Sequence, residues 1–463
     1  MTKCPKLLCQ MNNKPTSLID MLFDSRTLGL FVSIVFLFCC RVSTAQSTSD
    51  SLLNEATMQN VISYALNHQP AVQQAKVDEE IAEKVIKGKL ADWFPQINFT
   101  YNYQRFIDLQ TAVIGGNEIR FGVNNTSSAQ FNATQNLFNR DALLASRTAS
   151  KIRMLANQNT DRSKIDVIVD VTKAFYDVLA TAQQVKVSDQ SISRLERSLE
   201  TAYSRYSAGV ADKTDYKRAT ILLGNAKAER KANAEAMLFK QQYLKALIGY
   251  PLNAELPIQY DTLEMESEVS LDTLQQINYT EHIDYKILYT QRILQDANVK
   301  YSYWGFLPSL SAFGSYILNY QNDNFGDLYN REYPYSYVGA TLAFPIFQGG
   351  KRVAKVQEEK WRRRRLDLSL EDLANNLGSE YARAMASYKS NLAAYQTQQE
   401  NVGLAQEVYD VIQLQYQNGL RPYLDVTVAE AELRTTRINY YNALYQVLAS
   451  KIDVQRALGK VEY

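Results

Sequence analysis

The sequence predicts a mixed α+β membrane protein that is internally duplicated. In it, a long coiled-coil α-helical barrel adjoins a shared transmembrane β-barrel to which each protomer contributes four strands. Three observations support this fold class: landmarks repeat along the chain, each repeat holds strands that alternate apolar and polar residues, and each holds one very long uninterrupted helix. Gly (18) and Pro (10) are scarce for 463 residues, which favours long elements over many short ones.

The duplication is visible as landmarks that recur about 210 residues apart. The tetrapeptide YSAG that begins at Tyr206 returns as YQNG at Tyr416, and an Asp follows six residues after each Gly, at Asp215 and Asp425. Further landmarks keep this spacing: Gly249 with Gly459, Phe94-Pro95 with Leu307-Pro308, Asn136–Asn139 with Pro345–Gln348, and His68 with His282.

These landmarks divide the chain into a signal peptide at 1–45, a first repeat at 46–249, an equatorial linker region at 250–282 and a second repeat at 283–463. The first repeat contains a helix at about 69–92, strands at about 96–106 and 127–137, a long helix at about 139–207 and a helix at about 212–248. The second contains strands at about 308–320 and 333–344, a long helix at about 350–418 and a helix at about 422–458.

The long helices have the residue spacing of a coiled coil. Apolar residues such as Ile168, Val171, Phe175 and Val178 follow one another in steps of three and four, as a coiled-coil seam requires. At about 1.5 Å per residue such a helix is roughly 100 Å long. No ordinary globular domain needs a helix of that length.

The predicted strands are amphipathic. Ile97, Phe99, Tyr101 and Tyr103 alternate with polar residues, which indicates one apolar and one polar face. The strands have the length of tilted transmembrane strands, although a soluble four-stranded sheet would alternate in the same way. Four strands cannot close around an aqueous channel, and lipid does not tolerate open sheet edges. A membrane location therefore requires several protomers in one barrel.

The N-terminal residues resemble a secretory signal peptide. An apolar run at 28–40 is too short to span a bilayer, and Ser43 and Ala45 are small residues placed for cleavage. A signal anchor is an alternative, as is a lipoprotein signal at Cys39, where Phe38 is bulky for the preceding position. After cleavage no cysteine would remain, and so no disulfide, thiolate metal site or cysteine nucleophile, because the four cysteines are Cys4, Cys9, Cys39 and Cys40.

Composition and motifs argue against an enzyme or a nucleic-acid binder. The chain has 50 basic and 49 acidic residues, whereas nucleic-acid binders are basic. The run Arg362–Arg365 fits a solvated helix face better than a nucleic-acid site. His68 and His282 lack the spaced partners of a metal site, and no nucleophile arrangement or phosphate-binding loop is present. We expect no cofactor and no catalytic residue.

Two stretches carry a family resemblance: FPIFQGG from Phe344 and YQNGLRPYLDV from Tyr416. With the duplicated architecture, they resemble the TolC family of outer-membrane efflux proteins, also called outer membrane factors. The first repeat departs from the family pattern, since Asn139, Arg140 and Asp141 replace Gln-Gly-Gly. The resemblance implies a homotrimer with a twelve-stranded barrel among outer-membrane lipid and a twelve-helix extension into the periplasm. It implies a passive exit duct served by a periplasmic adaptor (membrane fusion) protein and an inner-membrane pump of RND or ABC type.

The two YxxG stretches are helix-hairpin turns. Gly209 and Gly419 suit the left-handed end of a helix, while Asp212 and Pro422 suit the start of the next one. A purely structural role as hairpin turns would account for both stretches. The resemblance nevertheless implies that these hairpins close the periplasmic end of the duct. The residues matching the family's gate are Tyr416, Arg421 and Asp215, with Asp425 at a lumen-facing acidic position and Val428 where the family has a second acid.

Two other functions stay open from the sequence. The duct could belong to type I protein secretion rather than small-molecule efflux, since both use this architecture. From another class, a non-conducting structural coiled-coil envelope protein would account for the helices, but it would leave the amphipathic strands unexplained.

Overall fold

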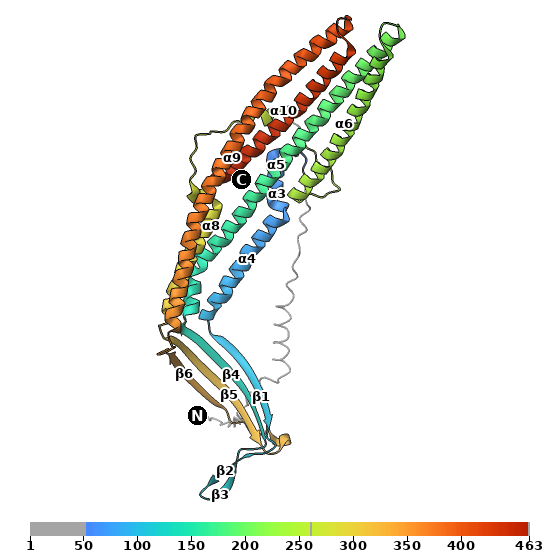
Figure 1. Ribbon diagram of the computed structural model, residues 1–463. Helices are drawn as coiled ribbons and strands as arrows, with labels where there is room; N and C mark the ends of the chain where they lie inside the picture. Colours follow the sequence, from blue (N-terminus) through green and yellow to red (C-terminus); the bar gives the residue numbers. More distant parts are fainter. Residues whose placement is uncertain (1–51, 260–261, 462–463) are drawn as a thin grey trace, which may run out of the picture. The chain divides into compact units, whose positions relative to one another are not determined.

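The computed structural model describes residues 52–259 and 262–461, and from Leu53 onward these form one compact unit. The predicted signal peptide and all four cysteines lie outside the described residues. The helices are α3 Met58–His68, α4 Pro70–Leu90, α5 Arg140–Ser207, α6 Lys213–Ile248, α7 Thr262–Ser267, α8 Ile283–Trp304, α9 Lys351–Gln417 and α10 Tyr423–Leu458 (Figure 1). The strands are β1 Gln96–Arg105, β2 Gln110–Ile114, β3 Asn117–Phe121, β4 Asn125–Phe138, β5 Ser309–Asn322 and β6 Tyr335–Ala343. Short 3-10 turns lie at Ala91–Trp93, Tyr279–Glu281 and Phe325–Asp327.

The two long helices start and stop at local signals. α5 has 68 residues, and the Asn139 side chain accepts hydrogen bonds from the amides of Asp141 and Ala142 at its start, as a helix cap does. α9 has 67 residues and begins after Gly350, whose φ of 82° is left-handed. Both helices end at a glycine turn. In the described part of the chain, no helix is both long and apolar enough to pass through a bilayer.

The helices form a layer in which the helices of the first repeat lie together on one side and those of the second repeat on the other. Toward the hairpin turns, α5 contacts α6 and α10, and α10 contacts α9, giving the order α6–α5–α10–α9 (Figure 1). Toward the sheet, the order is α4–α5–α8–α9. The outer members are therefore α6 and α4 on one side and α9 on the other.

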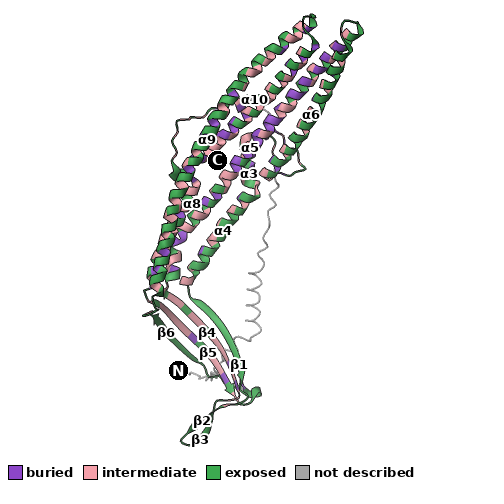
Figure 2. Cartoon of the chain, viewed as in Figure 1, coloured by how far each residue is buried: buried purple, intermediate pink, exposed green. Residues whose placement is uncertain are grey.

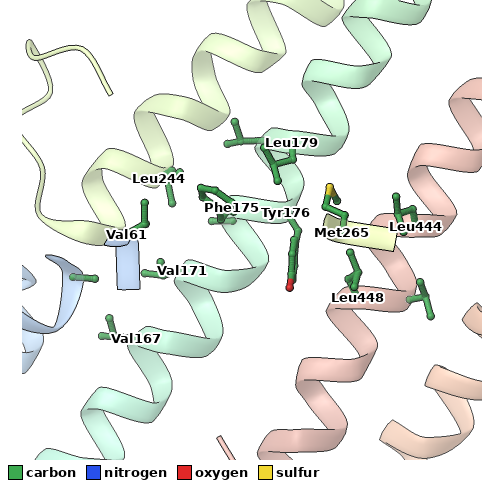
Figure 3. Close-up of a cluster of buried hydrophobic side chains, with 14 of the residues drawn as sticks. Val61, Val167, Val171, Phe175, Tyr176, Leu179, Leu244, Met265, Leu444 and Leu448 are labelled. Atoms are coloured by element: carbon green, nitrogen blue, oxygen red, sulfur yellow. The ribbon is translucent and has the colours of Figure 1, made fainter. Parts of the chain in front are cut away.

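A large apolar core lies where the repeats meet. Val171 and Phe175 of α5 are buried against Leu244 of α6 and Val61 of α3 on one side, and Leu448 of α10 belongs to the same core (Figure 3). The linker region contributes to this core through Met265 of α7 and through Val269, whose carbonyl accepts a hydrogen bond from the buried Tyr388 hydroxyl of α9.

The main sheet has four antiparallel strands in the order β1-β4-β5-β6. Register places Phe99 opposite Phe131, and Phe131 opposite Tyr316, so these rings share one face. The other face carries amides and hydroxyls, including the hydrogen-bonded group Gln130, Asn132 and Ser315. β1 and β6 are exposed along their whole length or nearly so (Figure 2). Each of these two outer strands pairs on one side only.

The structure differs from the sequence-based expectation in three places. The expected loop around Gly115-Gly116 is a hairpin of β2 and β3, because the two glycines adopt positive φ and so form a tight turn. The expected helix at 69–92 is α4, but a separate α3 precedes it. If the two repeats were alike at their histidines, His68 and His282 would each start a helix. His282 does so for α8, since its Nδ1 accepts the Asp284 amide, whereas His68 is the last residue of α3.

Candidate functional site

The predicted hairpin turns have the same backbone geometry. Gly209 and Gly419 have φ of 75° and 77°. In the first turn, the Gly209 N–H donates to the Tyr206 carbonyl, and the Val210 N–H donates to the Arg205 carbonyl. In the second turn, the Gly419 N–H donates to the Tyr416 carbonyl, and the Leu420 N–H donates to the Gln415 carbonyl. This pair of bonds is the Schellman motif, which satisfies the last carbonyls of a helix. The turns therefore end α5 and α9 at equivalent points.

The helices that follow start differently. Asp212 accepts a hydrogen bond from the Thr214 amide at 2.7 Å and caps α6. This bond lowers the pKa of the Asp212 carboxyl below its usual value because it favours the charged form. Pro422 precedes α10 and makes no side-chain cap.

Near the turns the two hairpins pack through a second apolar group, which we call the tip cluster. It consists of Ala202, Ala219, Tyr409, Tyr416, Tyr423, Val426, Ala429 and Leu433, all buried. These residues come from α5, α6, α9 and α10, so the cluster fastens one hairpin to the other within a single protomer.

Arg205 of α5 and Tyr416 of α9 form the contact nearest the turns. The Arg205 guanidinium lies 4.9 Å from the Tyr416 ring centroid, and its Nη1 donates to the Tyr416 carbonyl at 2.7 Å. A guanidinium over an aromatic face is attractive, and a charge-assisted bond to a carbonyl strengthens it. Arg205 was not among the residues that the sequence singled out.

The charge of Asp215 acts on two buried tyrosines, Tyr416 and Tyr423. Burial raises the pKa of Tyr416; Arg205 opposes this shift and Asp215 adds to it. Burial likewise raises the pKa of Tyr423, whose hydroxyl accepts a hydrogen bond from Ser198 while Asp215 raises its pKa further. Among the described residues the Tyr416 hydroxyl has no hydrogen-bond partner. The charge of Asp215 therefore acts on Tyr416 within one protomer, but no hydrogen bond joins the two side chains among the described residues.

Arg421 is not brought to Asp215 in the protomer. Its Nη1 pairs with Asp425 Oδ2 at 3.2 Å, and its Nε donates to Gln415. Arg421 is exposed, and within the described ranges it makes no ion pair with Asp215. Val428 is 58% exposed one turn beyond Asp425.

A buried ion pair that sequence reasoning missed lies deeper between the hairpins. Arg194 of α5 pairs with Glu430 of α10 at 3.0 Å, and the Ser191 hydroxyl donates to the same carboxylate at 2.7 Å. Both charged side chains are almost fully buried. A signal was present, since Glu430 interrupts the apolar stripe between Val426 and Leu433.

The described residues contain no group of three or more His, Cys, Asp or Glu that could hold a metal ion. The site consists instead of aromatic contacts, ion pairs and turns between two helical hairpins. Such an arrangement can hold two rigid elements together or let them part.

Solved structures with this fold are outer-membrane channels. A crystal structure of CusC, reported in connection with transmembrane channel formation, has a TM-score of 0.72 and 18% identity, covering 88% of this chain and 93% of that one. The open state of the Neisseria gonorrhoeae MtrE outer membrane channel has a TM-score of 0.68 and 19% identity, with coverages of 87% and 88%. The fold is thus that of an outer-membrane channel with long helices and a β domain.

Characterised relatives cover nearly the whole chain. Outer membrane protein TolC of Vibrio cholerae is 22% identical over 427 residues, covering 90% of this chain and 94% of its own. The alkaline protease secretion protein AprF of Pseudomonas aeruginosa is 19% identical, with coverages of 86% and 82%. The family model described as outer membrane efflux protein matches residues 61–250 and 292–460. The chain belongs to the outer membrane efflux protein family. It is a TolC-type outer-membrane protein, and this family consists of channels rather than enzymes.

Proposed function

We propose that this chain forms the passive, trimeric exit duct of a tripartite efflux or secretion system. The observation that carries the proposal is that the protomer is unfinished along two sides. β1 and β6 each lack a neighbour on one side, and α4, α6 and α9 are the outer helices. Unpaired strand edges are not tolerated in lipid. Head-to-tail contacts between copies pair the edges and close into a ring, with three copies as the resemblance implies.

The faces of the sheet suit a shared barrel. The face with Phe99, Phe131 and Tyr316 would meet lipid, and the amide and hydroxyl face would line the lumen. Arg105, at the end of β1, is the one charged residue in β1, β4, β5 and β6. This part of the duct would be polar but neutral and would not sort cargo by charge.

The hairpin turns form the gate in this proposal. Because α9 and α6 are outer helices, the α9–α10 hairpin of one protomer lies beside the α5–α6 hairpin of the next. The exposed Arg421 can then exchange Asp425 for Asp215 of the adjacent copy. Exposed ion pairs contribute only about 0–1 kcal/mol, so this link breaks easily. Tyr416 is assigned to the gate because the resemblance implies it, and Asp425 gives one acidic ring in the trimer.

The duct performs no chemistry in this proposal, so energy comes from an inner-membrane pump of RND or ABC type acting through a periplasmic adaptor. A heat-modifiable trimer in detergent that conducts ions in a planar bilayer tests the duct itself. Crosslinking from residues at the turns in intact cells, followed by identification of the captured proteins, tests the partners. A monomer that does not conduct would instead fit a structural envelope protein.

Type I protein secretion is the second candidate, because two relatives, AprF and the Dickeya chrysanthemi PrtF, are named for protease secretion. The same crosslinking distinguishes the two candidates. Capture of an ABC-type pump and accumulation of an unexported protein in a deletion strain favour secretion. Capture of an RND-type pump favours small-molecule efflux.

A further inference from the structure

A cavity of about 490 Å³ lies where the sheet meets the helices. Its volume is within the range of small-molecule sites, about 300–1,000 Å³. It is lined by the ends of β4 and β6, the starts of α5, α9 and β5, and the segment after α8; the residues used below are Arg140, Asp141, Trp304, Gly305, Phe344 and Arg352.

The cavity is charged because the two repeats differ there. The second repeat has Gln348, Gly349 and Gly350 between its strand and long helix, whereas the first has Asn139, Arg140 and Asp141. Arg140 therefore places a guanidinium where the equivalent position, Gly349, has no side chain. The difference adds one positive and one negative side chain to the cavity, Arg140 and Asp141, beside Arg352 of the second repeat.

Arg140 and Arg352 converge on Gly305. Arg140 Nη1 lies 2.8 Å from the point that a Cβ on Gly305 would occupy, and Arg352 Nη1 lies 3.5 Å from the Gly305 carbonyl oxygen. Each guanidinium also stacks on a ring, Arg140 on Tyr301 at 4.8 Å and Arg352 on Phe306 at 4.9 Å. Aromatic stacking fixes the orientation of both cations without neutralising them.

Neither arginine is paired with a carboxylate among the described residues. Arg352 donates to the carbonyls of Ile346 and Gly305, and Arg140 makes no ion pair within 4.0 Å with any residue that the structure describes. Asp141 also lines the cavity, where its carboxylate accepts the Tyr301 hydroxyl, so the lining carries two positive charges and one negative charge. Two guanidinium groups that approach one residue repel each other, so an anion between them would stabilise the arrangement. Guanidinium groups bind the oxygens of phosphate in a fork-like geometry.

The surroundings of the cavity indicate where such an anion comes from. The segment after β6 exposes Phe344, Ile346 and Phe347, the last two at 85% and 87%. Arginines and exposed aromatic rings at the end of membrane strands are typical of the depth of lipid headgroups. We propose that the cavity binds the phosphate group of an anionic phospholipid between Arg140 and Arg352, with the acyl chains along the apolar sheet face. The inference needs the outer-membrane location but not the conducting function.

The test uses the full chain in a neutral detergent. Of the three tryptophans, Trp304 lines the cavity, so a Trp93→Phe, Trp361→Phe background reports on this site alone. A short-chain phosphatidylglycerol, kept below its micelle concentration, should change Trp304 emission saturably. Arg140→Gln combined with Arg352→Gln should weaken binding at least tenfold, while the Lys replacements at both positions should retain part of it. Arg365→Gln, which removes one positive charge from α9 away from the cavity, should leave binding unchanged.

Four results would overturn the proposal. Titration without saturation would show that there is no site, and equal loss with Arg365→Gln would show unspecific attraction. Equal binding of the matching diacylglycerol, which lacks the phosphate, would show an apolar cavity only. Equal affinity for inorganic phosphate would show a free-anion site rather than a lipid site. Gel filtration of each variant confirms that the protein is assembled, and planar-bilayer conductance of the same samples tests the proposed function separately.

Discussion

The Arg205 guanidinium covers the ring of Tyr416 and donates to its carbonyl, which joins the ends of α5 and α9 next to both turns. In this protomer the hairpins are thus held together by an arginine of the first repeat rather than by Arg421 of the second. A stabilised closed state would therefore depend on Arg205 within each copy and on Arg421 between copies.

We predict that Arg205→Gln loosens the tip cluster and raises the mean conductance of single channels. Gln cannot stack as a cation on Tyr416, although it can still donate to the carbonyl. Arg197→Gln is the matched control, since Arg197 lies on the same helix and its Nε donates to a carbonyl of its own helix, that of Ser193. Equal conductance for Arg205→Gln and the wild type would exclude Arg205 from the closed state.

Substitution by alanine should reduce stability less at the turn glycines than at the glycines that end α6 and α10. A Cβ on Gly209 meets nothing within 4 Å, so Gly209→Ala costs only the left-handed backbone, about 1–2 kcal/mol. A Cβ on Gly249 would lie 2.7 Å from the His68 carbonyl oxygen, which adds a clash with backbone. Thermal unfolding should therefore show a larger decrease for Gly249→Ala than for Gly209→Ala. The reverse order would contradict the described packing.

Stability should fall with pH in the acidic range because of His282. Burial lowers the pKa of His282, and the charge of Arg456 lowers it further, whereas the charges of Asp284 and Glu380 and a hydrogen bond with the Arg456 backbone oppose this shift. As the pH falls, the unfolded state therefore binds a proton at this histidine before the folded state does. The contribution of neutral His282 to the free energy of unfolding is fully present above about pH 6.5 and decreases as the pH falls below that value. His282→Asn keeps an acceptor for the Asp284 amide and should reduce this dependence. If the unfolding temperature of His282→Asn depended on pH as it does in the wild type, the role of His282 would be contradicted.

A cysteine pair tests the contact between copies. On α4, Ile81, Val85 and Gly88 form an exposed stripe with open space above Gly88, which is the shape that receives a knob from a facing helix. Trp361 of α9 is 72% exposed. Trp361 lies at a similar level along the helices to the stripe on α4, because its neighbour Arg362 lines the same cavity as Val85.

Gly88→Cys with Trp361→Cys should therefore crosslink into a ladder that ends at three chains. No natural cysteine follows Cys40, so the mature protein should give no background. Gly88→Cys with Leu414→Cys is the control, since Leu414 lies far along α9 and should not react. Bands that never exceed one chain would contradict the proposed arrangement of outer helices.

Elements with a local pattern could be predicted from the sequence. The helix expected at 139–207 is α5, Arg140–Ser207, and the strand expected at 96–106 is β1, Gln96–Arg105, because heptad spacing and strict alternation are properties of short windows. The β2–β3 hairpin was missed although the signal existed: Gly115-Gly116 separates two short runs with β-branched residues. Its strands of five residues are too short for alternation to stand out.

Contacts between the hairpins could not be predicted in the same way. In the sequence, Arg205 and Tyr416 are separated by α6, α8, β5, β6 and most of α9. Nothing in the sequence around either residue specifies the other as its partner. The resemblance named Tyr416 and Asp215 together. In the structure the charge of Asp215 raises the pKa of Tyr416, but no hydrogen bond joins the two side chains among the described residues, so their pairing stays a prediction. The resemblance also suggested Arg421 with Asp215, whereas within one protomer Arg421 pairs with Asp425 four residues along its own helix, the shortest-range partner available to it.

The most direct measurement is single-channel recording of the purified protein in planar bilayers, comparing the wild type with Arg421→Ser and Asp215→Ala. A gated duct predicts discrete conductance steps for the wild type and larger steps for both variants, because each variant removes one side of the proposed link between protomers. Absence of discrete steps from an assembled trimer would contradict the duct. Identical steps in all three proteins would contradict the gate.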